Sequence, residues 1–580
     1  MKYVLYAATA IYCICISTTV MGQTGWKWGI ASGITSPNTG YQYMCGSIDK
    51  SSNIIIAGVI SGRDTVTIGT ESFMPFGTAI TSIVISEADS SGHFLWSLMA
   101  QDTFDAYPIS VAADAARNVY LFGFYWGDTL KFGRAVLTSA SVIVPTYFLA
   151  KISPTGTLIW AKKICSRGTG SVLIPALGQD NDFGCMAIDT ANNIYLSGSF
   201  DSTVTFGATT MTVSAGPLVH NEDIFVARFD SAGNPVWAKQ IGGNKNETSN
   251  GMTIASDGAI YVSCVSNSTL ITVAASSITP TDIVGGSLYM NFLVKLDTAG
   301  NEWWAKKITG HLGIGGLAAG TSGDFYLDGA IDSTVTLGTA VITSYDSHSF
   351  VLAKYDSSGS VLWAKTAKYM YDTYVGPHSI AIDGCGNAWV AISSDTTEDI
   401  EGYLLHSSVT GTEPLVMAEF DDTGQYLQSM IQNSGGDTWS DIMVDAQGDF
   451  YLAGTLNRGT DYFGPDSLSS PSWMPRSFVA RYRYNTTGTC AYAALEVPQQ
   501  HVPASESELK LSPNPARNTL SVQSSEPITT ITITDLMGQT ICSQLPPANC
   551  LLQTIDVSAY PAGMYLVRIN SREVRKWVKE

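Results

Sequence analysis

A short recurring segment constrains the fold of this chain more than any other feature of its sequence. The clearest copy is IFVARFDSAGNPVWAKQIGG at residues 224–243, and related copies begin at Phe148, Phe292 and Phe350. Each copy alternates apolar residues, turns at Asp-x-x-Gly or Ser-x-x-Gly, and continues in a run centred on Trp. Because Asp can bond its own backbone and Gly accepts a positive φ, the pattern predicts a β-hairpin.

A second recurring segment precedes each hairpin and is typical of two further strands around a turn. Clear copies are AADAARNVYLFG at residues 112–123 and AIDTANNIYLSG at residues 187–198. The whole unit of four short strands returns about every 65 residues and occurs seven times, from Trp26 to Asn485. Such a period indicates a β-propeller, and we predict an all-β, seven-bladed β-propeller.

The last copy lacks its outer strand, and a matching piece stands near the start of the chain as WKWGI, residues 26–30. We predict that this N-terminal strand pairs antiparallel with residues 478–484 and closes the ring, with Trp26 in the position of Trp237. The Trp residues that recur in the outer strands are interpreted as packing residues, with ligand stacking as the alternative: Trp96, Trp160, Trp237, Trp304 and Trp363.

Residues 1–22 have the pattern of a secretory signal peptide. Lys2 precedes an apolar run at residues 4–16, and Val20 and Gly22 are small enough for a cut before Gln23. No later apolar run approaches the ~18 residues that a transmembrane helix needs. The formal net charge of −19 and the lack of a basic stripe argue against a nucleic-acid partner.

The chain divides by composition into a propeller at residues 23–490, a Pro-, Ser- and Glu-rich linker at 491–508, and a small β-sandwich at 509–580. The propeller repeat resembles that of secreted bacterial seven-bladed β-propeller proteins. The tail resembles the type A C-terminal sorting domain of type IX secretion substrates. Its matching residues are Pro513, Asn514, Pro515, Gly538, Gly563, Tyr565 and Lys576. Lys576 belongs to a final strand rich in Lys and Arg, which also holds Arg575 and Lys579.

The resemblance of the tail implies an address. It implies that the type IX machinery recognises this domain and carries the protein across the outer membrane of a Gram-negative cell. The protein is then expected to be secreted or attached to the cell surface. An ordinary immunoglobulin-like module is the alternative for the tail.

Candidate binding residues lie in the loops that join an outer strand to the next inner strand. Three of these loops hold an Asp-x-aromatic triplet, and the loop at 366–379 is rich in aromatic residues. Acids and rings of this kind suit a glycan or a protein ligand, or else they fix the loop and pack on its neighbours. The candidates are Tyr107, Tyr371, Asp372, Tyr374 and Trp439.

The cysteines of an exported protein predict disulfides. Cys165 and Cys185 bracket the longest of these loops, and Cys542 and Cys550 lie close together in the tail, so we predict two bridges; buried free thiols are the alternative. No C-x-x-C spacing is present after the signal segment, and no metal or cofactor is expected.

Two functions follow from this pattern. In the first, the propeller is a binding or adhesion module at the cell surface. In the second, it is a secreted hydrolase or lyase that acts on polysaccharide or peptide. The regular repeats, and the lack of a Gly-x-Ser-x-Gly, H-E-x-x-H or phosphate-loop motif, favour the first, so no catalytic residue is assigned.

Overall fold

The computed structural model describes residues 25–483 and 510–579 with short gaps. The gaps are residues 32, 35–39, 62–64, 75–80, 103, 140–144, 167–184, 214–220, 274–275, 280–282, 285–286, 345–347, 370–379, 394–396, 401–402, 407–414, 433–439, 446–447, 457–458, 464–465, 471–475, 513–515, 524–527, 529, 536–539, 545–550, 562 and 570–572. The chain forms two compact units, residues 1–493 and 494–580. The predicted signal peptide and the whole of the predicted linker lie outside the described residues.

The described residues form strands and turns, without a helix, so the all-β prediction is confirmed for them. None of them belongs to a helix long and apolar enough to cross a membrane. We number the sequence repeats 1 to 7 in chain order. Repeats 1 to 3 consist of β3 (Gly40–Ile48), β4 (Ile54–Ser61), β7 (Thr81–Ala88) and β8 (Phe94–Asp102); β9 (Ala106–Ala113), β10 (Val119–Tyr125), β13 (Thr146–Ile152) and β14 (Leu158–Ser166); and β15 (Cys185–Ile188), β16 (Ile194–Phe200), β19 (Asp223–Phe229) and β20 (Pro235–Gly242).

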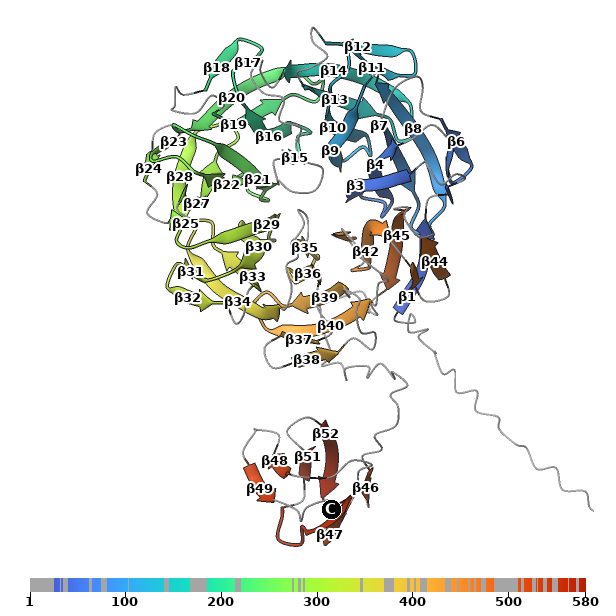
Figure 1. Ribbon diagram of the computed structural model, residues 1–580, viewed down its shortest axis with the longest axis vertical. Helices are drawn as coiled ribbons and strands as arrows, with labels where there is room; N and C mark the ends of the chain where they lie inside the picture. The colour runs from blue at the N-terminus through green and yellow to red at the C-terminus, as the bar shows by residue number, and fades with distance from the viewer. Residues whose placement is uncertain are drawn as a thin grey trace, which may run out of the picture. The chain divides into compact units, whose positions relative to one another are not determined.

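Repeats 4 to 6 have the same order of four antiparallel strands. They are β21 (Glu247–Ile254), β22 (Ile260–Ser266), β27 (Met290–Leu296) and β28 (Glu302–Ile308); β29 (Leu312–Ala319), β30 (Phe325–Ile331), β33 (His348–Tyr355) and β34 (Val361–Tyr369); and β35 (Ile380–Ile382), β36 (Ala388–Ser393), β39 (Leu415–Phe420) and β40 (Tyr426–Gln432). The first strands contact one another in the order β3, β9, β15, β21, β29 and β35. Figure 1 shows these strands innermost in a propeller-like arrangement.

Repeat 7 takes its fourth strand from the start of the chain. β41 (Ser440–Val444), β42 (Phe450–Leu456) and β45 (Arg476–Arg483) pair in order, and β1 (Gly25–Ala31) pairs antiparallel with β45. The register joins Trp28 to Arg481, just as Trp237 joins Arg228 in repeat 3. The prediction that Trp26 takes the position of Trp237 is therefore wrong by two residues: both strands carry a bulge at the same place, and Trp26 lies at the position of Pro235.

A small hairpin follows the second strand of each repeat, and the sequence analysis did not predict it. The hairpins are β5 (Val66–Ile68) and β6 (Glu71–Phe73), β11 (Thr129–Phe132) and β12 (Ala135–Thr138), β17 (Thr203–Phe206) and β18 (Thr209–Thr212), β23 (Ile271–Val273) and β24 (Ser276–Ile278), β31 (Thr334–Leu337) and β32 (Ala340–Thr343), β37 (Thr397–Ile400) and β38 (Tyr403–His406), and β43 (Gly459–Phe463) and β44 (Asp466–Ser470). Repeat 4 has one more, β25 (Ile283–Val284) and β26 (Ser287–Leu288). β11, β23 and β37 extend the preceding repeats by pairing with β8, β20 and β34.

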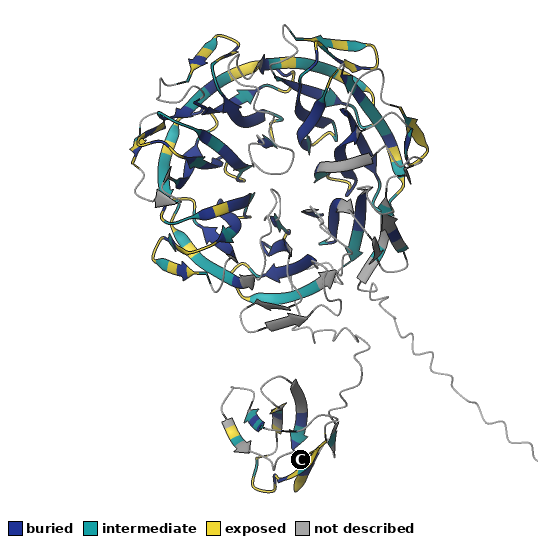
Figure 2. Ribbon diagram, viewed as in Figure 1, coloured by how far each residue is buried: buried dark blue, intermediate teal, exposed yellow. Residues whose placement is uncertain are grey.

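The core of the N-terminal unit lies between neighbouring repeats. One cluster joins Phe122 and Leu149 of repeat 2 to Leu196 and Phe225 of repeat 3, and each of these side chains is at most 1% exposed. Figure 2 shows the inner strands buried, with exposed positions concentrated on outer strands and hairpins. Since both faces of an inner sheet are covered, its strands are apolar almost throughout rather than alternating.

The C-terminal unit contains two antiparallel sheets. One has β46 (Lys510–Ser512), β47 (Thr519–Gln523) and β50 (Leu552–Asp556); the other has β49 (Thr540–Gln544), β48 (Ile531–Asp535), β51 (Gly563–Ile569) and β52 (Glu573–Lys579). Leu520, Ile555, Ile533, Val567 and Trp577 belong to one buried cluster, so the two sheets share a core.

The disulfide between Cys165 and Cys185 is absent from the structure, where both are buried free thiols. Cys165 is on β14, at one edge of its sheet, and Cys185 is on β15, which contacts β9 at the other edge. The two positions are thus separated by roughly three strand spacings, about 14 Å, well beyond the ~7 Å Cα separation that a disulfide tolerates. Cys542 is also free, Cys550 lies outside the described residues, and Cys385 is disulfide-bonded.

Candidate functional site

The best-defined functional candidate is the C-terminal unit, which is organised around a cluster of rings. Tyr565 on β51 lies opposite Trp577 on β52, with ring centroids 5.2 Å apart, and Tyr560 contacts both rings. The Tyr565 hydroxyl donates to the carbonyl oxygen of Pro561 at 2.8 Å. The Gly-x-Tyr motif therefore supplies a buried ring that joins the last two strands to the core.

The other sorting-motif residues are placed only in part. Gly563 pairs with Lys579, and Leu566 pairs with Lys576, between β51 and β52. Ala516 donates its backbone N–H to the carbonyl oxygen of Val578 at 2.9 Å, so the final strand is also tied to the first part of the unit. Pro513, Asn514, Pro515 and Gly538 lie outside the described residues.

In the N-terminal unit, the turn aspartates that recur in the sequence serve their own turns. Asp230 Oδ1 accepts the backbone N–H groups of Ala232 and Asn234, and Asp230 Oδ2 accepts the Asn234 side chain at 2.9 Å. Partial burial alone would raise the Asp230 pKa, but these hydrogen bonds outweigh it and the pKa is lowered. The D-x-x-G-N turns are thus hairpin turns, as predicted from the sequence.

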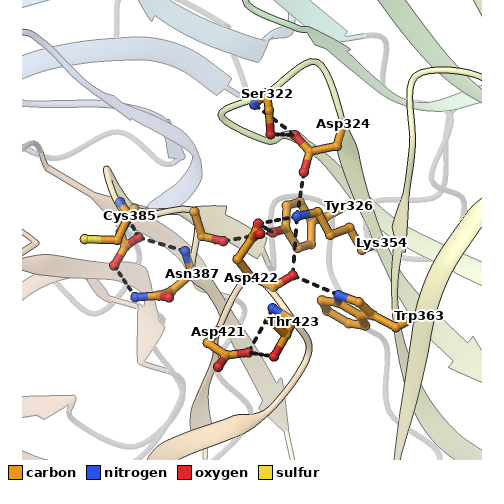
Figure 3. Close-up of polar contacts among 12 residues, drawn as sticks. Ser322, Asp324, Tyr326, Lys354, Trp363, Cys385, Asn387, Asp421, Asp422 and Thr423 are labelled. Atoms are coloured by element: carbon orange, nitrogen blue, oxygen red, sulfur yellow. Dashed lines mark hydrogen bonds and ion pairs between the residues drawn. The ribbon is translucent and has the colours of Figure 1, made fainter. Parts of the chain in front are cut away.

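A network of polar side chains joins repeat 5 to repeat 6 (Figure 3). The Lys354 ammonium on β33 lies 2.6 Å from Asp324 Oδ2 and also contacts the Asp422 carboxylate of repeat 6. The Trp363 indole N–H donates to the Asp422 carbonyl oxygen at 3.0 Å. Burial would lower the Lys354 pKa, but its hydrogen bonds to Asp324 and Asp422 reverse the direction and raise it.

Tyr326 completes this junction. Its hydroxyl donates to the Gly386 carbonyl oxygen at 2.8 Å, and the Lys354 ammonium lies 5.1 Å from the centre of its ring. Its ring also meets Trp363 edge-on, with the centroids 5.8 Å apart. A cation, an indole and a phenol of one repeat are thereby committed to the turns of the next repeat.

The same contacts recur at other junctions. Arg228 and Trp237 both donate to the Thr298 carbonyl oxygen at 3.0 Å. Lys295 and Trp304 both donate to the Ser357 carbonyl oxygen, at 2.7 and 3.3 Å. In repeat 7, Arg481 donates to the Ser90 carbonyl oxygen of repeat 1 at 2.5 Å. We use the term junction latch for the hydrogen bond from the cation of one repeat to a backbone carbonyl oxygen in the next repeat. At some junctions the Trp indole of the same repeat donates to that oxygen as well.

Each recurring Trp also packs on a glycine of the next repeat. The turn glycine Gly359 has φ +76°, and a Cβ placed on it would meet the Trp304 ring at 2.8 Å. Gly424 has φ +82°, and its Cβ would meet Trp363 at 2.6 Å. The glycine of Asp-x-x-Gly is thus required twice, for its backbone conformation and for the indole that covers it.

Repeat 1 carries the opposite charge at the latch position. Glu87 is fully buried, and it accepts hydrogen bonds from the Trp96 indole at 2.8 Å and from Arg117 at 2.9 Å. Arg117 reaches across from repeat 2 and also donates to Asp49 at 2.6 Å. This pair was not predicted from the sequence, because Glu87 and Arg117 are 30 residues apart in the chain and meet only when repeats 1 and 2 pack together.

The predicted binding residues are placed as follows. Tyr107 is 6% exposed and stacks on Phe124 with ring centroids 5.5 Å apart. For the triplet at 105–107, this is the alternative in which the ring packs on its neighbours. Its neighbour Asp105 accepts the Thr81 hydroxyl at 2.9 Å. Tyr371, Asp372, Tyr374 and Trp439 lie outside the described residues. Within the described part of the chain, no group of three His, Cys, Asp or Glu side chains could hold a metal ion.

The tail of this chain matches a known family. Residues 510–580 match the secretion system C-terminal sorting domain. The chain therefore carries a type IX sorting domain, engages the type IX secretion machinery through it, and is exported to the cell surface or the extracellular space.

The rest of the chain is similar to repeat proteins at low identity. It is 22% identical over 528 residues to an uncharacterized WD repeat-containing protein of Acanthamoeba polyphaga mimivirus. That similarity covers 74% of this chain and 36% of the relative, so the chain spans about a third of the relative's length.

Two solved structures are also similar. A streptogramin B lyase is 9% identical, with a TM-score of 0.35 over 79% of this chain and 98% of that chain. PorZ, a surface component of the type IX secretion system of Porphyromonas gingivalis, is 9% identical, with a TM-score of 0.19 over 93% and 82%. At these scores neither similarity assigns an activity.

Proposed function

We propose that this chain is a binding or adhesion module of the cell surface, built as a seven-bladed β-propeller that β1 closes. Its ligand is an extracellular glycan or protein. The tail at residues 509–580 is a type A sorting domain, which follows a linker at 491–508 and a signal peptide at 1–22. The observation that carries the binding role is that the recurring side chains are already occupied by contacts within the fold.

Three contacts support seven blades and a closed ring. β41 of repeat 7 contacts β3 of repeat 1. β2 (Gly33–Ile34), which follows the outer strand β1, pairs with β5 in the small hairpin of repeat 1. In the same way, the outer strand β8 of repeat 1 pairs with β11 in the small hairpin of repeat 2. Arg481 of repeat 7 makes the latch to Ser90 of repeat 1. Each contact repeats at the seam what an internal junction does, and a closed ring protects the sheet edges.

The binding role is assigned to residues outside the recurring contacts of the repeats. The turn aspartates, outer-strand tryptophans and buried cations are occupied by their own turns or by the next repeat. The loops between repeats vary in sequence and remain for recognition. We assign the ligand contacts to Tyr371, Asp372, Tyr374 and Trp439 in these loops. The buried Tyr107 supports one of the loops from the core.

An array of glycans, beside an activity screen on polysaccharides and peptides, tests the proposal with the full secreted chain. We expect saturable binding without turnover. Binding should fall at least tenfold in a Tyr371→Ala/Tyr374→Ala variant, and should persist in a Leu95→Ala variant that alters an exposed residue on β8. A cleaved product formed by the purified chain would overturn the proposal in favour of a hydrolase or lyase.

Export is tested by the tail alone. Removal of residues 509–580 should leave the N-terminal unit folded in the periplasm, because that unit has its own core. Fusion of residues 491–580 to an inert periplasmic reporter should send the reporter outside a cell with the type IX machinery. A reporter that stays in the periplasm would contradict the assignment of these residues as a sufficient signal.

A further inference from the structure

A pair of buried acids lies at the junction of repeats 3 and 4, outside every feature described above. Glu247 is the first residue of β21, and Asp223 is the first residue of β19. Both residues are 0% exposed. The Glu247 backbone N–H donates to the Glu222 carbonyl oxygen at 2.8 Å, so the start of β21 is tied to the start of β19.

The two oxygens of the Glu247 carboxyl group have different surroundings. Glu247 Oε1 accepts the Ser266 hydroxyl at 2.6 Å and the Ser268 hydroxyl at 2.5 Å. Glu247 Oε2 is buried and has no hydrogen-bond partner among the described residues. A buried anionic oxygen without a donor is costly, whereas a protonated oxygen carries no charge. Protonation of the carboxyl group at Oε2 would remove this cost of a buried charge.

The groups that face Glu247 favour its neutral form. Burial is the largest cause that raises its pKa, which lies at about 7 against an ordinary 4.5, and the negative charge of Asp223 on β19 adds to it. The Ser266 and Ser268 hydroxyls and the Gly243 N–H oppose the shift. Among the described residues, the Cys264 thiol on β22 is a further titratable neighbour, and its own pKa is raised by burial and by Glu247.

The repeat itself does not require these acids. The register places Thr146 and Ser349 at the position of Asp223 in repeats 2 and 5. It places Ala106 and Leu312 at the position of Glu247 in the same repeats. A small or apolar residue therefore serves the fold at either position, and the acids are an addition that repeats 2 and 5 do without.

The loop before β21 is shaped to cover the pair. A Cβ on Gly242 would lie 2.3 Å from the Asp223 carboxylate, and one on Gly243 would lie 2.4 Å from the Ser268 hydroxyl. Two consecutive glycines thus allow the backbone to lie directly on the acids. The Gln240 side chain also donates to the Asp223 carboxylate.

We propose that Glu247 makes the junction of repeats 3 and 4 responsive to pH. In acid surroundings it is a neutral hydrogen-bonded carboxylic acid, and in alkaline surroundings it is a buried anion beside Asp223. Ionisation places two like charges across the junction and loosens the start of β21. The stability of this junction therefore falls as the pH of the medium outside the cell rises from acid to neutral.

The direction of the effect follows from the two protonation states. Between pH 4.5 and about 7 the folded junction keeps a proton that the unfolded chain has lost. Stability is therefore greatest below pH 4.5, falls as the pH rises to 7, and levels off above it. The shift in pKa corresponds to a change in the opening equilibrium of up to about 300-fold.

Hydrogen–deuterium exchange of the full chain tests the proposal. The readout is the protection of peptides that cover residues 244–254, between pH 5 and pH 8.5 and corrected for intrinsic exchange. In the wild type and in a Glu71→Gln control on exposed β6, protection should fall by tens of fold, at most about 75-fold, across this range. In Glu247→Gln, which is neutral at every pH, it should stay within about threefold.

Asp223→Asn provides a second variant that keeps the titrating group. It should retain the fall but move its midpoint to lower pH, because it removes a charge that favours the proton. The same pH profile in the wild type and in Glu247→Gln would overturn the proposal. So would calcium that restores protection at pH 8.5 in the wild type and not in Glu247→Gln, because a bound cation would then replace the proton.

Discussion

Lys295 and Lys354 occupy the same position in repeats 4 and 5 but lie in different electrostatic surroundings. Both are buried, at 2% and 3% exposure. Both reach the turn of the next repeat, where Lys295 donates to the Ser357 carbonyl oxygen at 2.7 Å and Lys354 donates to the Asp422 carbonyl oxygen at 3.4 Å. The backbone part of the latch is therefore common to the two junctions.

The difference lies in the carboxylates. Lys354 meets Asp324 at 2.6 Å, whereas Ala259 stands at the corresponding place of repeat 4. Burial lowers the Lys295 pKa, and the more distant Asp257 and Asp356 do not reverse it. The Lys354 pKa is raised, because its hydrogen bonds to carboxylates outweigh burial. The repeat thus requires a donor to the next turn, and an ion pair is optional.

The largest effect is expected where a carboxylate would lose its cation. Lys354→Met should destabilise the N-terminal unit by about 3 kcal/mol, since Asp324 remains buried without its counter-charge. Lys295→Met should cost less than about 1 kcal/mol, because it removes a buried charge that has no carboxylate in contact. Calorimetry of both variants of the full chain at pH 7 compares the two costs.

A double variant identifies the cause. If the cost of Lys354→Met comes from the unpaired carboxylate, Asp324→Ala in the same chain should recover at least half of it. Equal losses in Lys295→Met and Lys354→Met, without recovery in the double variant, would show that packing of the long side chain matters and the charge does not.

The glycines under the indoles should be equivalent at the two junctions. Gly359→Ala and Gly424→Ala each force a Cβ into the Trp304 or Trp363 ring at a positive φ. Each should lower the unfolding temperature by a similar amount, equivalent to about 1–2 kcal/mol. A loss in one variant alone would show that the packing of Trp on Gly differs between the junctions. Gly133→Ala, at φ +57° with open space around it, separates the cost of strain from the cost of contact.

The sequence predicted the repeat well because its signals are local. Alternating strands, the Asp and Gly of a turn and the position of Trp are properties of neighbouring residues. In repeat 3, the segments at 187–198 and 224–243 each form the predicted two strands around a turn. The charge at the latch was not predictable in this way. Asp324, Lys354 and Asp422 are distant in sequence and meet only after three strands and two repeats have packed.

Two errors have the same origin. The equivalence of Trp28, rather than Trp26, to Trp237 is visible only in the register with β45. The disulfide of Cys165 and Cys185 looked short along the chain, but Cys165 lies at one edge of its sheet and Cys185 lies on a different sheet that contacts the opposite edge. Glu247 and Asp223 were missed because neither residue carries a motif and their burial comes from the packing of two repeats.

A smaller effect is expected in the alkaline range, with opposite signs for the two lysines. The raised pKa of Lys354 means that its stabilisation is complete below pH 10.5 and is lost above it. The lowered pKa of Lys295 means that the folded chain loses this proton first, so stability rises as the pH approaches 10.5. Unfolding temperatures between pH 8 and 11 should therefore show the wild type gaining stability relative to Lys295→Met as the pH rises. A constant difference from the wild type would contradict this sign.

The smallest effect is expected at the seam, and it tests whether repeat 7 joins repeat 1 as repeat 5 joins repeat 6. Arg481 donates to the Ser90 carbonyl oxygen and to Asp449, but Arg483 also donates to Asp449 at 3.0 Å. Arg481→Met therefore leaves that carboxylate paired and should cost less than about 1 kcal/mol.

The local consequence is more informative than the global one. In Arg481→Met, amide exchange should increase severalfold in the turn at residues 89–93, which is distant in sequence and belongs to repeat 1. The matched variant Arg228→Met should do the same at residues 297–301, where Thr298 is the acceptor. Increased exchange at residues 297–301 in Arg228→Met, without any at 89–93 in Arg481→Met, would show that the ring is open at the seam. Increases at both turns would show that the strand from the start of the chain completes a junction like the others.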